Sequence, residues 1–200
     1  IHVDPTSESA LATAKPADMI LVTDVHGDHM DPEAIDMINK ESTIYVAPAA
    51  LAGKFPGTTE IIANGETRTI DGVSVQAVGS YNLQRGPKPG MLFHEMGRAN
   101  GYVLTLGGQR IFFSGDTECV PEIEALTNID VAFLTMNLPY TMPPSEAADC
   151  AKAFRPGIVY AYHYRGMGEP TPQENQQAFV AAMKGTAGIE VRTPNFYPGQ

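Results

Sequence analysis

Short apolar runs alternate with segments of helical periodicity along this chain, and such alternation is typical of α/β domains. The strand candidates are short apolar stretches bounded by polar or glycine-containing turns. We expect strands at residues 19–23, 43–46, 61–62, 67–70, 73–78, 102–106, 110–114, 131–135, 158–162 and 189–192. Residues 1–5 have the character of a strand end that runs into a turn.

Helices are predicted where apolar residues recur at helical spacing behind a capping residue. We expect them at residues 32–39, 49–54, 120–126, 145–154 and 172–184. Asp31 followed by Pro32 is a typical helix start, Ser145 is the expected cap of its helix, and Gly185 ends the last one. Residues 83–100 are predicted to form a long loop, and loops of this length in compact domains are usually functional or mobile.

Composition and charge restrict the classes of function. The 200 residues are 43% hydrophobic, which suits a single domain spanning residues 1–200 with a substantial core. A net charge of −10 disfavours nucleic acid and anionic membranes as partners, because a diffuse acidic surface repels both. No stretch is long and apolar enough to span a bilayer. We therefore expect a small-molecule substrate, which can be anionic where bound cations reverse the local field.

The two cysteines, Cys119 and Cys150, form no CxxC or other paired spacing. This excludes a zinc knuckle or a local redox motif. We interpret them as two buried or half-buried thiols, with a disulfide as the alternative.

The candidate chemistry begins in residues 24–29 (DVHGDH), directly after the apolar run 19–23. Four of these six side chains, Asp24, His26, Asp28 and His29, can bind a metal ion. Imidazole and carboxylate together suit zinc, manganese or iron(II). The alternative is a polar turn that caps the next helix, but four such groups on one loop are costly unless something neutralises them.

Two later segments have the same form, an apolar strand that ends in a metal-capable side chain. Asp116 follows the strand at 110–114, and His163 follows the strand at 158–162. A single Asp in this place is commonly a turn residue, and a single His is commonly structural. The order of a clustered motif, a strand with Asp and a strand with His favours a shared metal site.

These features resemble the metallo-β-lactamase superfamily, whose ligand loop reads HxHxDH and matches residues 24–29. The wider sequence is similar to the branch of ascorbate-6-phosphate lactonase-like hydrolases at residues 78–82, 101–103, 115–121, 129–132 and 140–142. The resemblance implies an αββα sandwich over nearly the whole chain. It also implies a binuclear site for one or two divalent ions, Zn²⁺ first and Mn²⁺ or Fe²⁺ as alternatives, held by Asp24, His26, Asp28, His29, Asp116 and His163.

The chain departs from the family pattern in three places. Asp24 stands where the family has its first His, a hard ligand that favours manganese or iron over zinc. No mid-chain His stands at the expected position near Asn82, so Asn82 or His94 is the candidate, and we interpret His94 as a substrate-facing or surface residue rather than a ligand. Family members usually carry strands before the segment that matches residues 1–5, so we expect a sandwich without them. Asp4 is expected behind the ligands.

The resemblance predicts a metal-dependent hydrolase that directs an activated water onto an ester, lactone or phosphoester. Asp28 or Asp116 is expected to take the proton. The side chains expected to hold the substrate or its developing oxyanion are His94, Tyr140, Arg85 and Arg98. Tyr140 is equally well interpreted as a core aromatic residue.

A non-catalytic metal-binding or interaction module on the same fold is the alternative function. It follows from Asp24 in place of His and from the missing mid-chain His. The resemblance includes exported bacterial proteins, so we expect a periplasmic or secreted location rather than a cytoplasmic one. An uncovered sheet edge leaves a homo-oligomer open.

Overall fold

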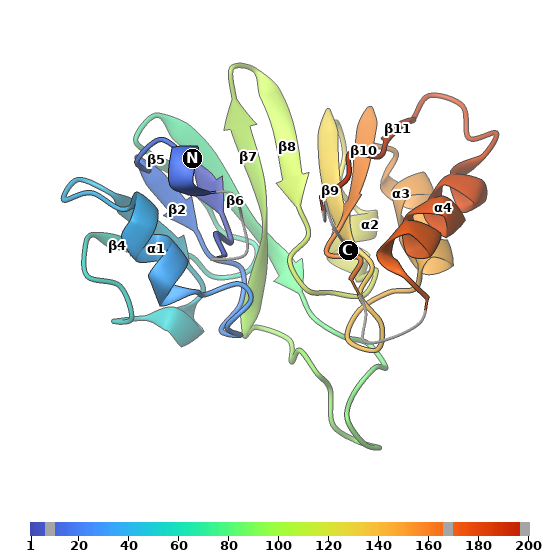
Figure 1. Cartoon of the computed structure of the whole chain (residues 1–200), viewed down its shortest axis with the longest axis horizontal. Helices are drawn as coiled ribbons and strands as arrows, with labels where there is room; N and C mark the ends of the chain where they lie inside the picture. Colours follow the sequence, from blue (N-terminus) through green and yellow to red (C-terminus); the bar gives the residue numbers. More distant parts are fainter. Residues whose placement is uncertain (7–10, 166–169, 197–200) are drawn as a thin grey trace.

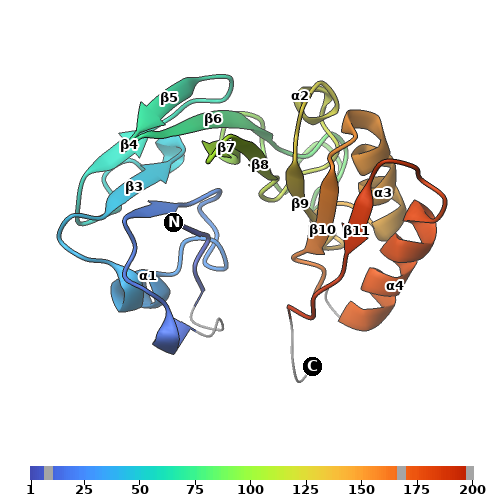
Figure 2. The same ribbon diagram turned by 90° about the horizontal axis from the view of Figure 1, so that it is seen from above.

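The computed structural model describes residues 1–6, 11–165 and 170–196, and two β-sheets form its centre. Helix α1 lies outside one sheet, and helices α3 and α4 lie outside the other (Figures 1 and 2). This arrangement confirms the predicted αββα sandwich.

The smaller sheet has four parallel strands in the order β1-β2-β3-β4. Their bounds are His2–Val3, Met19–Leu21, Ile44–Ala47 and Thr59–Ile61. Strand β1 pairs with β2 at the edge of this sheet, with Val3 opposite Leu21. The expectation that residues 1–5 are a strand end running into a turn is therefore confirmed, because β1 ends at Val3.

The larger sheet has seven strands in the order β11-β10-β9-β8-β7-β6-β5. From β5 to β11 the strands are Thr67–Ile70, Val73–Ser80, Ala99–Leu106, Gln109–Phe113, Val131–Thr135, Ile158–Tyr162 and Glu190–Arg192. Neighbours from β5 to β8 are antiparallel, and neighbours from β8 to β11 are parallel. The antiparallel half is built from hairpins, whereas the parallel half needs helical crossovers.

Among the described residues, four α-helices and two short 3₁₀ turns make the crossovers and the outer layers. The helices are α1 (Pro32–Ile38), α2 (Pro121–Glu124), α3 (Pro144–Phe154) and α4 (Pro172–Met183), and the turns are Leu11–Thr13 and Ala49–Leu51. No helix among the described residues is long and apolar enough to cross a membrane.

Strand β2 shows how the pattern of the sequence produces the layers. Side chains of a strand alternate between its two faces. Met19 and Leu21 pack into the cluster between the two sheets, and Ile20 packs into the cluster under α1. Because the strand is covered on both sides, its sequence is a continuous apolar run rather than an alternating one.

The strand ends bring the predicted chemistry to one edge of the sandwich. Strands β8, β9 and β10 are parallel and in register, with Phe113 opposite Phe133 and Tyr162 opposite Thr135, so their carboxyl ends lie together. The end of β2 joins them across the two sheets. The Asn100 backbone N–H donates to the Thr23 carbonyl oxygen at 2.9 Å, which fixes this end of β2 against β7.

Several predicted boundaries are corrected. Ser145 does not cap its helix, because α3 begins one residue earlier at Pro144 and its N-cap is Pro143. The strand predicted at 102–106 begins at Ala99, inside the segment predicted to be loop. The Asn64 side chain donates to the Ala99 carbonyl oxygen at 3.0 Å and to the Asn100 side chain, and a contact so distant in sequence leaves no local signal.

The cysteines form a disulfide between Cys119 and Cys150, so the interpretation as two thiols is wrong. The bond joins the segment after β8 to helix α3 across 31 positions of sequence. The two residues become neighbours through the packing of α3, which spacing alone does not indicate.

Candidate metal centre

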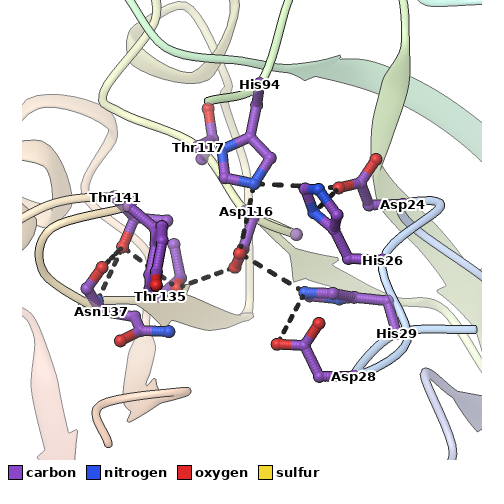
Figure 3. A network of polar contacts seen from close by, with 12 residues as sticks. Asp24, His26, Asp28, His29, His94, Asp116, Thr117, Thr135, Asn137 and Thr141 are labelled. Atoms are coloured by element: carbon purple, nitrogen blue, oxygen red, sulfur yellow. Dashed lines mark hydrogen bonds and ion pairs between the residues drawn. The ribbon is translucent and has the colours of Figure 1, made fainter. Parts of the chain in front are cut away.

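Seven side chains converge at the edge where β2, β8 and β10 end, in two clusters of possible metal ligands. The first cluster is Asp24, His26 and His94, and the second is Asp28, His29 and His163. Within each cluster the possible ligand atoms lie within 4.8 Å of one another. Asp116 lies between the clusters and faces both of them (Figure 3).

The second cluster combines Asp28 and His29, from the loop after β2, with His163, which follows β10. His163 Nε2 lies 3.3 Å from Asp28 Oδ2, and His29 Nε2 lies 3.9 Å from the same oxygen. Asp116 presents one oxygen to each imidazole, with Oδ2 3.4 Å from His29 Nε2 and Oδ1 3.5 Å from His163 Nε2. Two carboxylates and two imidazoles therefore surround one point.

The first cluster is reached by Asp116 Oδ2, the oxygen that also faces His29 of the second cluster. Asp116 Oδ2 lies 3.4 Å from His94 Nε2, and His94 Nε2 lies 3.8 Å from Asp24 Oδ2. His26 Nδ1 lies 2.7 Å from Asp24 Oδ2. Asp116, one of the six ligands that the resemblance implies, is thus within reach of both clusters.

Polar side chains behind the imidazoles fix the directions of the His29 and His163 rings. Asp4 Oδ2 accepts from His29 Nδ1 at 2.8 Å and from the Thr23 hydroxyl at 2.6 Å. The expected place of Asp4 behind the ligands is confirmed. Asn137 Nδ2 lies 3.3 Å from His163 Nδ1. Outer partners of this kind set which ring nitrogen is free to bind a metal.

His94 is oriented by Asn82. Asn82 Oδ1 accepts from both the backbone N–H and the Nδ1 of His94, each at 2.8 Å, and this directs His94 Nε2 at Asp116. The amide of Asn82 is therefore a support rather than a ligand. His94 is 1% exposed and belongs to the first cluster, so the interpretation of His94 as substrate-facing is corrected.

Glu118 holds the start of the long loop that carries these residues. Its carboxylate is buried and accepts the backbone N–H groups of three consecutive residues, Leu83, Gln84 and Arg85, at 2.8 to 3.1 Å. Sequence reasoning did not single out Glu118. Its position two residues after Asp116 was the one available signal.

The pKa of each titratable group at the centre depends on the charges of its neighbours. Burial raises the pKa of Asp116, but the nearby imidazoles of His29 and His163 outweigh it and hold that pKa far below its usual value. Burial lowers the pKa of His29, but the carboxylates of Asp116 and Asp4 outweigh it and raise that pKa well above the usual value. Burial lowers the pKa of His94. These shifts favour a protonated His29 and a neutral His94 in the metal-free chain.

The residues present fit a bound cation. The Nε2 atoms of His29 and His163 are buried without a hydrogen-bond partner among the described residues, and both are directed at the second cluster. A buried polar atom without a partner is costly unless something else satisfies it. Four imidazoles and three carboxylates form the mixed donor set that zinc, manganese and iron(II) accept in proteins.

Comparison with known proteins identifies the family. Residues 1–163 match the family described as the β-lactamase superfamily domain. The chain belongs to the β-lactamase superfamily. It is 32% identical over 177 residues to a UPF0173 metal-dependent hydrolase of Thermococcus onnurineus. The match covers 82% of this chain and 76% of the relative. A UPF0173 metal-dependent hydrolase of Enterococcus faecalis is 30% identical over 190 residues, covering 92% of this chain and 83% of the relative.

Solved structures give the same assignment for this superfamily member. A structure from Parabacteroides distasonis, assigned as a metal-dependent hydrolase, is 39% identical and covers 96% of this chain and 82% of its own, with a TM-score of 0.81. The metallo hydrolase Igni18 of Ignicoccus hospitalis, at 19% identity, has a TM-score of 0.69 over 95% of this chain and 81% of its own. The likeness to Igni18 concerns the fold. The chain is a metal-dependent hydrolase of the metallo-β-lactamase fold.

The arginines of this hydrolase are not placed as expected for substrate contacts. Arg85 pairs with Glu118 at 3.2 Å and with Glu146 at 2.7 Å. Arg98 pairs with Asp24 at 2.9 Å. Both guanidinium groups are held by carboxylates of the protein, so the expectation that they hold substrate is corrected.

Tyr140 lies beside the loop that carries His94. Its ring contacts Phe93 edge to face at 5.0 Å between ring centroids, and its carbonyl oxygen accepts from Asn82 Nδ2 at 2.8 Å. The residue therefore helps to support the Asn82–His94 pair, and its side chain is half-buried. A contact between Tyr140 and substrate stays a prediction.

Proposed function

We propose that the two clusters bind up to two divalent ions and that the enzyme hydrolyses an ester, lactone or phosphoester of a small molecule. The observation that carries this proposal is Asp116, one buried carboxylate with imidazoles of both clusters within 3.5 Å of its oxygens. Such an arrangement suits two ions that share one carboxylate. The substrate class rests on the resemblance of residues 24–29, 116 and 163 to the lactonase-like branch.

The ions, when bound, supply Lewis acidity and bring the pKa of water towards neutrality. The residues of this chain supply the rest. One ion would be held by His26 and His94, and the other by His29 and His163. Asp116 would contribute its carboxylate to both positions. Asp4 and Asn82 keep the rings of His29 and His94 in place, so that little reorganisation is needed when a substrate arrives.

Asp28 is the proposed proton acceptor. Its side chain is 55% exposed, whereas that of Asp116 is 5% exposed, so Asp28 can exchange protons with solvent and substrate. The imidazole of His163, whose Nε2 lies 3.3 Å from Asp28 Oδ2, is the main cause that lowers the pKa of Asp28 to about 2, and the group is ionised at neutral pH. Tyr140 is proposed to contact the substrate from the loop side of the site.

Metal reconstitution coupled to turnover tests the function. The purified protein is stripped with a chelator, dialysed, and loaded separately with Zn²⁺, Mn²⁺ and Fe²⁺, and the metal content is measured by elemental analysis. Each form is assayed against lactones, p-nitrophenyl esters and bis-p-nitrophenyl phosphate. We expect turnover that requires bound metal and is lost in Asp116→Asn. The matched control is Asp149→Asn on α3, whose carboxylate pairs with Lys152 at 2.9 Å at the surface.

Metal binding without turnover on any substrate class, with each metal in turn, would instead favour the non-catalytic module. Failure to bind metal would reject both functions.

We also propose that the enzyme works in an oxidising compartment, such as the periplasm. The disulfide between Cys119 and Cys150 supports this location, because structural disulfides persist mainly outside the reducing cytosol. Thiol labelling of the protein in intact cells tests it. Blocked cysteines are expected, and free thiols would contradict the location.

A further inference from the structure

Arg98 makes a two-point contact with Asp24 in the first cluster. Arg98 Nε donates to Asp24 Oδ1 at 3.2 Å, and Arg98 Nη2 donates to Asp24 Oδ2 at 2.9 Å. The Asp24 side chain is fully buried, and the Arg98 side chain is 25% exposed. Paired contacts of this geometry are among the stronger polar interactions in proteins.

The two clusters therefore differ in charge. Within the described residues, the ion-pair partners of Asp28 and Asp116 are imidazoles, which can lose their protons and turn to a metal ion. Asp24 has a guanidinium partner, whose positive charge is permanent. The Asp24–Arg98 pair is close to neutral overall, so the first cluster lacks part of the negative charge that its residues would otherwise offer a cation.

The pair also occupies the atoms that a metal ion needs. Asp24 Oδ2 is 2.9 Å from Arg98 Nη2 and 2.7 Å from His26 Nδ1, and a carboxylate oxygen has two lone pairs. Because Arg98 Nε donates to Oδ1 and Arg98 Nη2 to Oδ2, a divalent ion bound to either oxygen of Asp24 has to share that oxygen with Arg98 or displace it. It is also repelled by the guanidinium charge on the other side of the same carboxylate.

We propose that Arg98 makes the two metal positions unequal: the position at Asp28, His29 and His163 fills first, and the position at Asp24, His26 and His94 binds more weakly because Arg98 competes for Asp24. This inference rests on the proposed metal function and deepens it. It makes the occupancy of the first position depend on the supply of free metal.

Calorimetric titration of MnCl₂ into the metal-free full chain, with elemental analysis of each stoichiometric step, tests the proposal. The unmodified chain is expected to bind two ions in separate steps whose affinities differ by roughly tenfold or more. Arg98→Met is expected to tighten the weaker step by roughly tenfold or more and to leave the tighter step nearly unchanged. The matched control is Arg68→Met, which removes a guanidinium that pairs with Glu60 and Glu66 at the surface.

A second variant separates competition for Asp24 from a general change of charge. In an Asp24→Asn background the contact with Arg98 loses its ionic partner, so Arg98→Met is expected to have a much smaller effect on the weaker step. Equal effects in both backgrounds would overturn the proposal. If Arg98→Met does not fold without metal, Arg98→Lys keeps the charge but not the two-point contact. It is expected to tighten the weaker step by a smaller factor, and an unchanged step would overturn the proposal.

The outcomes distinguish this inference from the function on which it rests. Two steps of equal affinity in the unmodified chain would overturn the role of Arg98 and leave the metal-dependent function intact. Absence of any bound metal would overturn the proposed function itself.

Discussion

Asn82 holds His94 at two points, because one side-chain oxygen accepts both the backbone N–H and the ring Nδ1–H of that residue at 2.8 Å. This contact turns a loop histidine into a member of the first metal cluster. The mid-chain histidine that the family supplies from another position is thus replaced by His94. The pair is in turn anchored through Asn82 Nδ2, which donates to the Tyr140 carbonyl oxygen at 2.8 Å.

Asn82→Ala is expected to weaken metal binding at the first position by roughly 10–100-fold, because the ring of His94 loses its orienting acceptor. The second position shares only Asp116 with the first, so its affinity should change little. Calorimetric titration with Mn²⁺ measures both steps. Asn39→Ala, which removes an amide at the end of α1 that donates to Ile35 and Asp36, is the matched control. An unchanged weaker step would show that His94 is not a ligand.

Asp4→Asn is expected to act on the second position instead. The change removes a negative charge 2.8 Å from His29 Nδ1, so the raised pKa of His29 should fall in the metal-free chain. Metal affinity at this position should fall by roughly 10–100-fold, because a carboxylate partner raises the basicity of a ligand imidazole. NMR titration of the histidine ring protons gives the pKa, and calorimetry gives the affinity. A pKa of His29 that does not move would contradict the role given to Asp4.

Metal binding is expected to release protons at neutral pH. His29 has a raised pKa and carries a proton in the metal-free chain, and a metal ligand imidazole has to be neutral. Lowering the pH favours the protonated ring and weakens metal binding, and raising the pH through the pKa of His29 strengthens metal binding. Titrations in buffers of different ionisation enthalpy should show release of about one proton at the tighter step. Binding that is independent of buffer and pH would contradict a protonated His29.

Loss of the disulfide is expected to destabilise the fold. Cys119 and Cys150 are 31 positions apart, and closing a loop of this length removes conformational entropy of the unfolded chain equivalent to about 4 kcal/mol. Replacing both cysteines by alanine should lower the free energy of unfolding by about that amount, measured by urea denaturation. Reductant should have a similar effect on the unmodified protein and none on the double variant. Equal stability of oxidised and reduced protein would show that the bond contributes nothing.

Local pattern predicted the α/β class and the metal-capable groups at strand ends, and the resemblance to the family supplied the αββα sandwich and the set of six ligands. Asp116 and His163 follow apolar strands of the larger sheet whose carboxyl ends finish together, and Asp24 follows an apolar strand of the smaller sheet that ends at the same edge of the sandwich. The same reasoning could not place His94, because a residue in the middle of a long loop has no periodicity. Its position depends on Asn82, and on Glu118 from a different segment.

The ion-pair partners of charged residues could not be predicted from the sequence either. Arg98 is 74 positions from Asp24, and nothing in the spacing of either residue indicates that they pair. The disulfide and the early start of β7 depend on packing between distant segments in the same way. Local pattern thus predicts which groups reach the edge, while tertiary contacts decide which of them are free to bind.

The most direct test is a crystal structure of the protein loaded with Mn²⁺ or Zn²⁺, with anomalous scattering recorded to locate the ions. The account predicts a strong peak bounded by Asp28, His29, His163 and Asp116, and a weaker peak bounded by Asp24, His26, His94 and Asp116. Peaks elsewhere, or ions at this edge with no bond to Asp116, would contradict the central claim that one buried carboxylate joins two metal positions.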